Sequence, residues 1–247
     1  MEKYIIAVDM DGTLLNSENK ISERNRNVLQ RLIDDGHYVV PATGRTRELI
    51  PQEFSVLRGV KWGIVENGCV VWDYDKNEMI WRKTMPKGMV SKILKDVEDS
   101  GAKGWIAEAY ANGIAYSDAD ARDYVASVAD KDLLEKTFVD YFLSRHKYVK
   151  DFYHQEDILN QAEKINIYFD DMENSRELRK KWKDLDDVAV TTSISALSPV
   201  TSLAASFTYC LELPMATPMP APSSISRSFS LSPKVIFCDI RYDKRRG

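Results

Sequence analysis

The feature that most constrains the fold is a strand–helix–strand pattern in the first 45 residues. Residues 4–8 (YIIAV) are an uninterrupted apolar run with β-branched members, which is typical of a strand buried on both faces of a parallel sheet. Ser22 is a candidate N-cap for a helix that Gly36 ends, and residues 37–42 form a second apolar run. Such units are right-handed with parallel strands. The pattern predicts an α/β fold with a Rossmann-like parallel sheet, in which the loops after both strands open at one edge.

Two carboxylates, two residues apart, follow the first strand in Asp9-Met10-Asp11-Gly12-Thr13. Two carboxylates this close repel each other, so this placement is unfavourable unless a bound cation or a reaction at phosphate makes use of it. In phosphoryl transfer, Asp9 would attack phosphorus, Asp11 would protonate the leaving oxygen, and Gly12 would permit the tight turn. The alternative is an ordinary surface turn, since Asp-Gly is a common turn dipeptide.

The second strand ends in a polar string, Pro41-Ala42-Thr43-Gly44-Arg45. It brings a hydroxyl, a small residue and a cation to the edge where the carboxylates lie. A phosphoryl group with three oxygens requires donors of this kind. The sequence therefore predicts a phosphate site at this edge.

Three segments with different patterns follow one another along the chain. After a third strand at 62–65 and a hairpin to residue 82, longer helices alternate with single strands. We expect residues 1–83 to form the first part of the core, 84–188 an inserted α+β domain, and 189–247 the return to the core. A strand at 188–192 would make that return.

The composition changes abruptly after residue 190. Residues 191–233 hold only two charged side chains, Glu212 and Arg227, but many serines and six of the nine prolines. Neither a helical nor an alternating period is present there, and the prolines at 214, 218, 220 and 222 forbid a regular helix. This C-terminal part of the core is therefore atypical.

The strings DMDGTLL, PATGR and ENG, in this order and spacing, resemble motifs of the haloacid dehalogenase (HAD) superfamily, in its Cof-like branch with a type IIB cap. The resemblance covers about residues 1–190. It implies a Mg²⁺-dependent phosphatase that forms an aspartyl-phosphate on Asp9, uses Asp11 as general acid and base, and binds phosphate with Thr43. Further residues match motif neighbours that line the substrate side: Gly12, Thr13, Gly44, Arg45 and Asn67. Residues 84–188 would be the cap.

The resemblance also implies a lysine that neutralises the phosphate, and a G-D-x-x-N-D string that completes the magnesium site. Residues 191–233 contain no lysine, and the chain has no such string. The metal ligands would then be Asp9, Asp11 and Asp239, which follows the apolar run 235–238. An alternative is that residues 191–247 are the product of a shifted reading frame.

These residues are compatible with three functions. The first is hydrolysis of a small phosphorylated metabolite such as a sugar phosphate, with activity reduced in this chain. The second is binding of a phosphometabolite without turnover, and the third is a phosphomutase.

Composition and charge indicate which partners and which cellular compartment to expect. Net charge is −4, the pI is about 5.5 and basic residues are not clustered apart from Lys244, Arg245 and Arg246, so we expect no nucleic-acid partner. The apolar run at the N-terminus is too short for a signal peptide or a membrane span. Three widely spaced cysteines fit a reducing, cytoplasmic location. The oligomeric state stays open.

Overall fold

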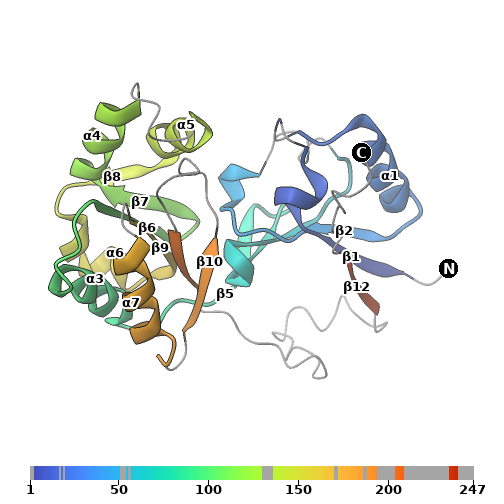
Figure 1. Cartoon of the computed structure of the whole chain (residues 1–247). Helices are drawn as coiled ribbons and strands as arrows, with labels where there is room; N and C mark the ends of the chain where they lie inside the picture. Colours follow the sequence, from blue (N-terminus) through green and yellow to red (C-terminus); the bar gives the residue numbers. More distant parts are fainter. Residues whose placement is uncertain are drawn as a thin grey trace. The chain divides into compact units, whose positions relative to one another are not determined.

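A computed structural model of the chain describes residues 3–16, 18, 20–50, 54, 57–129, 136–169, 172–185, 188–193, 204–208 and 234–238. The chain divides into two compact units. Unit 1 holds Met1–Trp81 and Leu211–Gly247, and unit 2 holds Arg82–Cys210. Figure 1 shows the elements of both units.

Unit 1 is built on a parallel sheet in the order β12-β1-β2 (Figure 1). The three strands are β1 (Tyr4–Val8), β2 (Tyr38–Pro41) and β12 (Lys234–Cys238). Helix α1 (Glu23–Asp34) connects β1 to β2, and the Ser22 side chain accepts a hydrogen bond from the Asn25 N–H at its first turn. The predicted strand–helix–strand unit and its N-cap are confirmed.

A second sheet of unit 1, in the order β3-β4-β5, continues from the edge of β2. Its strands are β3 (Trp62–Val65), β4 (Val70–Asp73) and β5 (Glu78–Arg82). A parallel bridge joins Ala42 to Ile64, so β3 follows β2 along the same direction. Short helices in the described loops of this unit include η1 (Met10–Leu14), η2 (Arg47–Leu49) and η3 (Glu66–Gly68).

Unit 2 contains a six-stranded sheet in the order β10-β11-β9-β6-β7-β8. Its strands are β6 (Trp105–Ala111), β7 (Ile114–Asp118), β8 (Lys147–Val149), β9 (Ala162–Phe169), β10 (Ala189–Ser193) and β11 (Ala204–Thr208). The pairing is antiparallel except between β7 and β8. The predicted β6–β7 hairpin turns at Asn112-Gly113, where both residues have positive φ.

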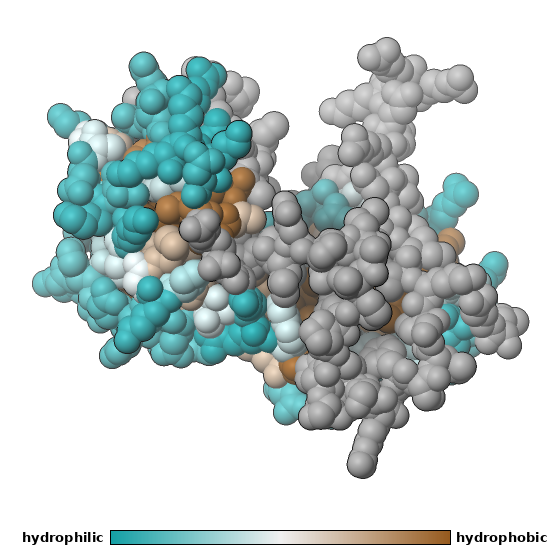
Figure 2. Space-filling view, turned by 90° about the horizontal axis from the view of Figure 1, so that it is seen from below, coloured by the Kyte–Doolittle hydropathy of each residue, from teal (hydrophilic) through white to brown (hydrophobic). Residues whose placement is uncertain are grey.

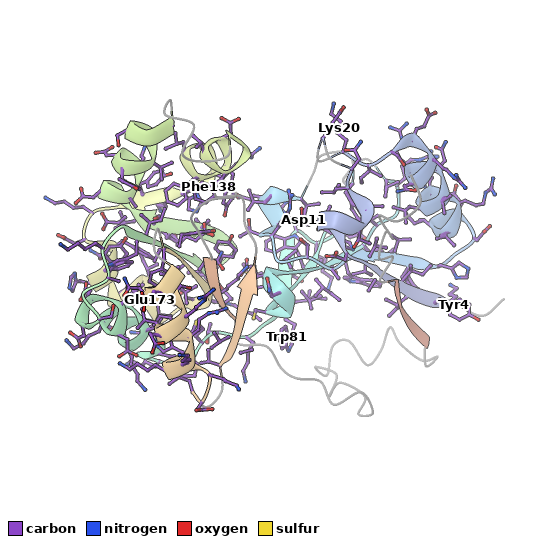
Figure 3. The ribbon with its side chains drawn as sticks, viewed as in Figure 1. Tyr4, Asp11, Lys20, Trp81, Phe138 and Glu173 are labelled. Atoms are coloured by element: carbon purple, nitrogen blue, oxygen red, sulfur yellow. The ribbon has the colours of Figure 1, made fainter. Side chains whose placement is uncertain are left out.

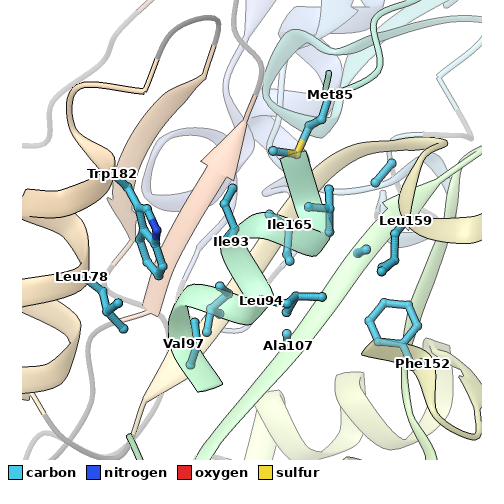
Figure 4. Close-up of a cluster of buried hydrophobic side chains, with 14 of the residues drawn as sticks. Met85, Ile93, Leu94, Val97, Ala107, Phe152, Leu159, Ile165, Leu178 and Trp182 are labelled. Atoms are coloured by element: carbon cyan, nitrogen blue, oxygen red, sulfur yellow. The ribbon is translucent and has the colours of Figure 1, made fainter. Parts of the chain in front are cut away.

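Helices cover both faces of this sheet. The helices of unit 2 are α3 (Met89–Asp99), α4 (Ala119–Val128), α5 (Lys136–Arg145), η5 (Phe152–His154), α6 (Glu156–Leu159) and α7 (Met172–Trp182). On one face, Ile93 and Leu94 of α3 and Trp182 of α7 pack with Ile165 of β9 in a buried apolar cluster (Figure 4). On the other face, α4 and α5 pack against Tyr168. The sheet is thus the middle layer of an α+β unit.

The prediction that a strand at 188–192 would return the chain to the parallel sheet is wrong. Strand β10 pairs antiparallel with β11, and β11 pairs antiparallel with β9, so both extend the sheet of unit 2. The return to unit 1 comes later, with β12. A short apolar segment of low charge can form a strand in either sheet. The residue pattern alone therefore does not predict which sheet the strand joins.

Polar side chains cover most of the described surface. In Figure 2, hydrophilic residues dominate the visible face of unit 2. Large apolar side chains that are exposed include Val28 (53%) and Tyr124 (47%), which lie in different units. Among the residues that the structure describes, no helix combines the length and the apolar character needed to cross a membrane.

Candidate active site

The loop after β1 holds the first pair of predicted site residues. Asp9 follows the strand directly, its side chain is exposed, and its Oδ2 accepts a hydrogen bond of 2.8 Å from the Thr13 hydroxyl. Met10, the next residue, is fully buried and anchors η1 in the apolar core of unit 1. Because Met10 points inward, its two acidic neighbours are left on the polar side, as the D-x-D spacing predicts.

Asp11 forms a two-point ion pair with Arg45. The Nε of Arg45 donates to Oδ2 over 3.0 Å and Nη2 donates to Oδ1 over 2.5 Å, while Nη1 donates to the Leu49 carbonyl. The side chains of Asp11 and Arg45 are 53% and 28% exposed, so water screens the pair and its contribution to stability is small. Its importance lies in geometry, because it joins the loop after β1 to the loop after β2. Figure 3 labels Asp11 in the first of these loops.

Thr43 lies beside Asp9 at the same edge of the sheet. The register pairs Val8 with Pro41, and the Ala42 N–H donates to the Val8 carbonyl over 2.9 Å. Thr43 is 5% exposed, and its Oγ1 accepts a hydrogen bond of 3.2 Å from the Arg45 N–H. A hydroxyl that accepts one hydrogen bond can also donate one, and an anionic oxygen is a suitable acceptor.

A tight turn after β3 is hydrogen-bonded to the loop after β2, next to Thr43. The Asn67 N–H donates to the Thr43 carbonyl over 3.1 Å, and the Glu66 N–H donates to the Arg45 carbonyl over 2.9 Å. Both turn residues have positive φ, 53° for Glu66 and 57° for Asn67. This is an uncommon conformation for glutamate, and such residues cluster at functional sites. The turn therefore fixes the loop after β2 through backbone bonds.

Glu66 is the site residue that sequence analysis missed. Its side chain is 0% exposed, although it lies one residue before Asn67 at the edge of the sheet. A buried carboxylate is costly unless other groups compensate its charge. Its position in the ENG string was the only signal in the sequence, and that string does not distinguish a buried glutamate from an exposed one.

Strand β12 reaches the same edge from the other side of β1. The parallel register pairs Tyr4 with Lys234 and Val8 with Cys238, so both strands end level with each other. Asp239 is the residue after Cys238, but it lies outside the described residues. Whether its side chain joins the site therefore stays a prediction.

The structure brings most of the predicted residues together. The loops after β1, β2 and β3 meet at one edge of unit 1, and they carry all the predicted catalytic and substrate-binding residues: Asp9, Asp11, Gly12, Thr13, Thr43, Gly44, Arg45 and Asn67. The arrangement offers the exposed carboxylate of Asp9, a second carboxylate paired with a cation, and one buried hydroxyl. These groups can attack, neutralise and hold a phosphoryl group.

Comparison with known proteins gives the family. The model of the haloacid dehalogenase-like hydrolase family (Hydrolase_3) matches residues 6–204. A 5-amino-6-(5-phospho-D-ribitylamino)uracil phosphatase of Bacillus subtilis is 41% identical over 81 residues, which are 33% of this chain and 32% of that protein. A second phosphatase of Bacillus subtilis is 30% identical over 127 residues, 51% of this chain and 43% of that protein. The matched segments thus span less than half of these relatives.

Solved structures show the same fold. A haloacid dehalogenase-like hydrolase from B. subtilis superposes with a TM-score of 0.61 at 24% identity, over 82% of this chain and 72% of that chain. A HAD subclass IIB sugar phosphatase superposes with a TM-score of 0.59 at 16% identity, over 83% and 69%. With its parallel sheet, its inserted α+β unit and a family match over most of its length, the chain belongs to the haloacid dehalogenase-like hydrolases.

Proposed function

We propose that this protein is a Mg²⁺-dependent phosphatase that hydrolyses a small phosphorylated metabolite through an aspartyl-phosphate on Asp9. The observation that carries the proposal is the exposed Asp9 carboxylate beside the buried Thr43 hydroxyl and the Asp11–Arg45 pair. Family membership and relatives named phosphatases support it.

In the proposed reaction, Asp9 is the nucleophile. Its Oδ2 is held by Thr13, which leaves Oδ1 to attack phosphorus. Asp11 protonates the leaving oxygen and then takes a proton from the water that attacks the aspartyl-phosphate. Because Arg45 engages both oxygens of Asp11, this carboxyl group must be released before it can carry a proton. We infer that substrate phosphate competes with Asp11 for Arg45 and so frees it.

The remaining residues hold the phosphate. The Thr43 hydroxyl donates to one phosphate oxygen, and the backbone around Gly12 and Gly44 permits close approach of the others. Asn67 lies beside Thr43 through its backbone bond and completes the substrate side. In this proposal, substrate selection falls to unit 2 (Arg82–Cys210), which contains the residues 84–188 predicted as the cap.

The metal site requires hard oxygen ligands, and the described residues supply part of the set. Asp9 offers an exposed carboxylate oxygen, whereas both oxygens of Asp11 bind Arg45. Within the described part of the chain, no three His, Cys, Asp or Glu side chains gather closely enough to hold a metal ion. Asp239, which follows a strand that ends level with β1, is the proposed further ligand. When bound, Mg²⁺ would neutralise the charge on the transferred phosphoryl group.

The test is phosphate release by the full chain with Mg²⁺ from p-nitrophenyl phosphate, a panel of sugar phosphates and 5-amino-6-(5-phospho-D-ribitylamino)uracil. The last compound is included because of the Bacillus subtilis relative. Asp9→Asn should lower kcat by about 10⁴-fold or more, because it removes the nucleophile. Thr46→Ser, a conservative change at a buried residue of the adjacent loop, serves as the control for folding. Equal turnover by Asp9→Asn and the unaltered protein would exclude the proposed mechanism.

A second candidate is a phosphometabolite-binding protein without turnover. The observation that favours it is the absence of any lysine from residues 191–233, where the family places a charge-neutralising lysine. Calorimetry distinguishes the two, since a Mg²⁺-dependent heat of binding without phosphate release supports the binding protein. Sugar-phosphate isomerisation in place of phosphate release would indicate a phosphomutase.

A further inference from the structure

Arg45, which pairs with Asp11, is also held by the short helix that follows it in the chain. Its Nη1 donates to the Leu49 carbonyl over 3.1 Å, and Leu49 is the last residue of η2 (Arg47–Leu49). The Nε and Nη2 groups of Arg45 bind Asp11 instead. When a substrate phosphate replaces Asp11, as in the proposed reaction, the bond to Leu49 remains. The position of η2 therefore decides where the guanidinium of Arg45 lies.

Helix η2 has few internal contacts that fix it. The Leu49 N–H donates to the Thr46 carbonyl over 3.0 Å, and the Ile50 N–H donates to the Arg47 carbonyl over 3.3 Å. Within the described part of the chain, no side-chain bond from Thr46 caps this helix, and none of its three residues is buried. Single 3₁₀ turns have poor hydrogen-bond geometry, and isolated short helices are unstable in water. The helix therefore needs a contact from another element to keep its position.

Arg47 makes such a contact with Trp72 of β4. The Cζ atom of Arg47 lies 4.6 Å from the centre of the Trp72 ring. A guanidinium at this distance over an indole face is attracted by the ring electrons, and the attraction is stronger where water is partly excluded. Trp72 is fixed by its strand, since the register of the β3–β4 hairpin pairs it with Gly63. The stack thus joins η2 to the sheet of unit 1.

A second aromatic ring, that of Tyr74, lies close to this stack. Its hydroxyl packs against Gly63, where an added Cβ would lie 2.6 Å from it. Burial raises the pKa of Tyr74 to about 12, while the positive charge of Arg47 acts in the opposite direction. The Tyr74 hydroxyl and the Nε1 of Trp72 are both buried, and neither has a hydrogen-bond partner among the described residues. The guanidinium of Arg47 therefore lies against aromatic side chains that are largely shielded from water.

We propose that Arg47 and Trp72 are a positioning pair, whose stack fixes η2 and, through the Leu49 carbonyl, orients the guanidinium of Arg45 toward the substrate phosphate. The catalytic part of this proposal rests on the proposed phosphatase function. In the structure, Arg45 divides its donors between Asp11 and Leu49. A fixed Leu49 carbonyl keeps the guanidinium oriented while phosphate replaces Asp11. Less conformational freedom is then lost on binding, and the affinity for phosphate is higher.

The first test needs no activity and follows the arginine side chains of the full-length protein by proton–nitrogen NMR. Trp72→Leu should remove the ring-current shift of the Arg47 Nε–H and speed hydrogen exchange of the Arg45 Nε–H by about tenfold. Trp72→Phe keeps an aromatic face and should preserve most of this protection. Trp62→Leu is the matched control, because it removes another tryptophan of the same sheet, which packs against Tyr38 at 5.2 Å. Unchanged exchange of Arg45 in Trp72→Leu, or equal acceleration in the control, overturns the proposal.

The second test separates phosphate binding from turnover. Trp72→Leu should weaken the binding of inorganic phosphate, measured by calorimetry, by about tenfold. For p-nitrophenyl phosphate, KM should rise by about the same factor while kcat changes by less than about twofold, because Arg45 binds the phosphate in the ground state and the transition state alike. Trp72→Phe should restore most of the affinity. A fall in kcat at unchanged KM, or an equal rise of KM in Trp62→Leu, refutes the positioning role. If the unaltered protein releases no phosphate from any substrate, the proposed function fails, whereas the NMR result still decides whether the stack positions Arg45.

Discussion

Replacing Glu108 with glutamine should destabilise the protein by about 3 kcal/mol at neutral pH. Glu108 lies in β6, and its carboxylate is fully buried between the sheet and α5. Five side chains bind it: His146, Tyr110 at 3.2 Å, Tyr141 at 2.9 Å, Tyr168 at 2.6 Å and Asn166 at 2.5 Å. An ionised carboxylate only accepts hydrogen bonds, so all five groups donate to it.

His146 is held between the carboxylate of Glu108 and the backbone of α5. Its Nε2 faces the carboxylate of Glu108, and its Nδ1 faces the Phe142 carbonyl at 3.0 Å. Each ring nitrogen therefore faces an oxygen, one of a side chain and one of the backbone. Glu108 and His146 are therefore a fully buried hydrogen-bonded pair, and glutamine would remove the carboxylate from it.

The expected loss of unfolding free energy follows from the pKa of Glu108. Burial alone would raise this pKa, but the charge of His146 and the hydrogen bonds from His146, Tyr168 and Asn166 outweigh burial and lower it from 4.5 to about 2. At about 1.4 kcal/mol per pKa unit, this difference corresponds to about 3 kcal/mol. Because the folded-state pKa is depressed, this stability is present above pH 4.5 and is lost as pH falls toward 2.

The assay is urea denaturation followed by circular dichroism between pH 7 and pH 2.5. The unaltered protein should lose stability steeply below pH 4.5, whereas Glu108→Gln should start lower and change less over that range. Glu177→Gln is the control, because it removes an ion pair of unit 2 whose side chains are 65–73% exposed, with an expected effect below about 1 kcal/mol. If Glu108→Gln and the unaltered protein have parallel pH dependences, the ion-pair reasoning is wrong.

Three further predictions concern stability and the metal. Ser22→Ala should lower the free energy of unfolding by about 1 kcal/mol, because the Asn25 N–H loses its acceptor, and chemical denaturation measures this. Gly59→Ala should be destabilising by roughly 1–3 kcal/mol, because φ is +89° and the new Cβ would lie 2.8 Å from Cγ2 of Ile33; a rise in melting temperature would contradict it. Chelation with EDTA should abolish phosphate release and added Mg²⁺ should restore it, in a turnover assay with Ca²⁺ as the comparison ion.

The sequence was sufficient for the parts of the fold that depend on local pattern. The apolar run before Asp9, the Ser22 cap and the Asn112-Gly113 turn each specify a structure within a few residues, and all three are present. The meeting of the loops after β1 and β2 also followed from the sequence, because parallel strands end at one edge.

What the sequence did not predict depends on contacts between distant segments. The ion pair of Asp11 with Arg45 and the burial of Glu66 are set by how three loops meet. Strand β10 was assigned to the wrong sheet because a short β-prone run such as residues 188–192 fits a strand in either sheet. Propensity does not specify a strand's partner, since pairing depends on the faces that remain uncovered after the rest has folded.

The pairing of β12 with β1 has a consequence for the order of folding. Tyr4 and Lys234 are 230 residues apart, and all of unit 2 lies between them. Contacts of such sequence separation form late, because closing a long loop costs entropy before it gains contacts. During synthesis, unit 2 is made while β1 still lacks one neighbour, and this edge of the strand stays unpaired until residues 234–238 leave the ribosome.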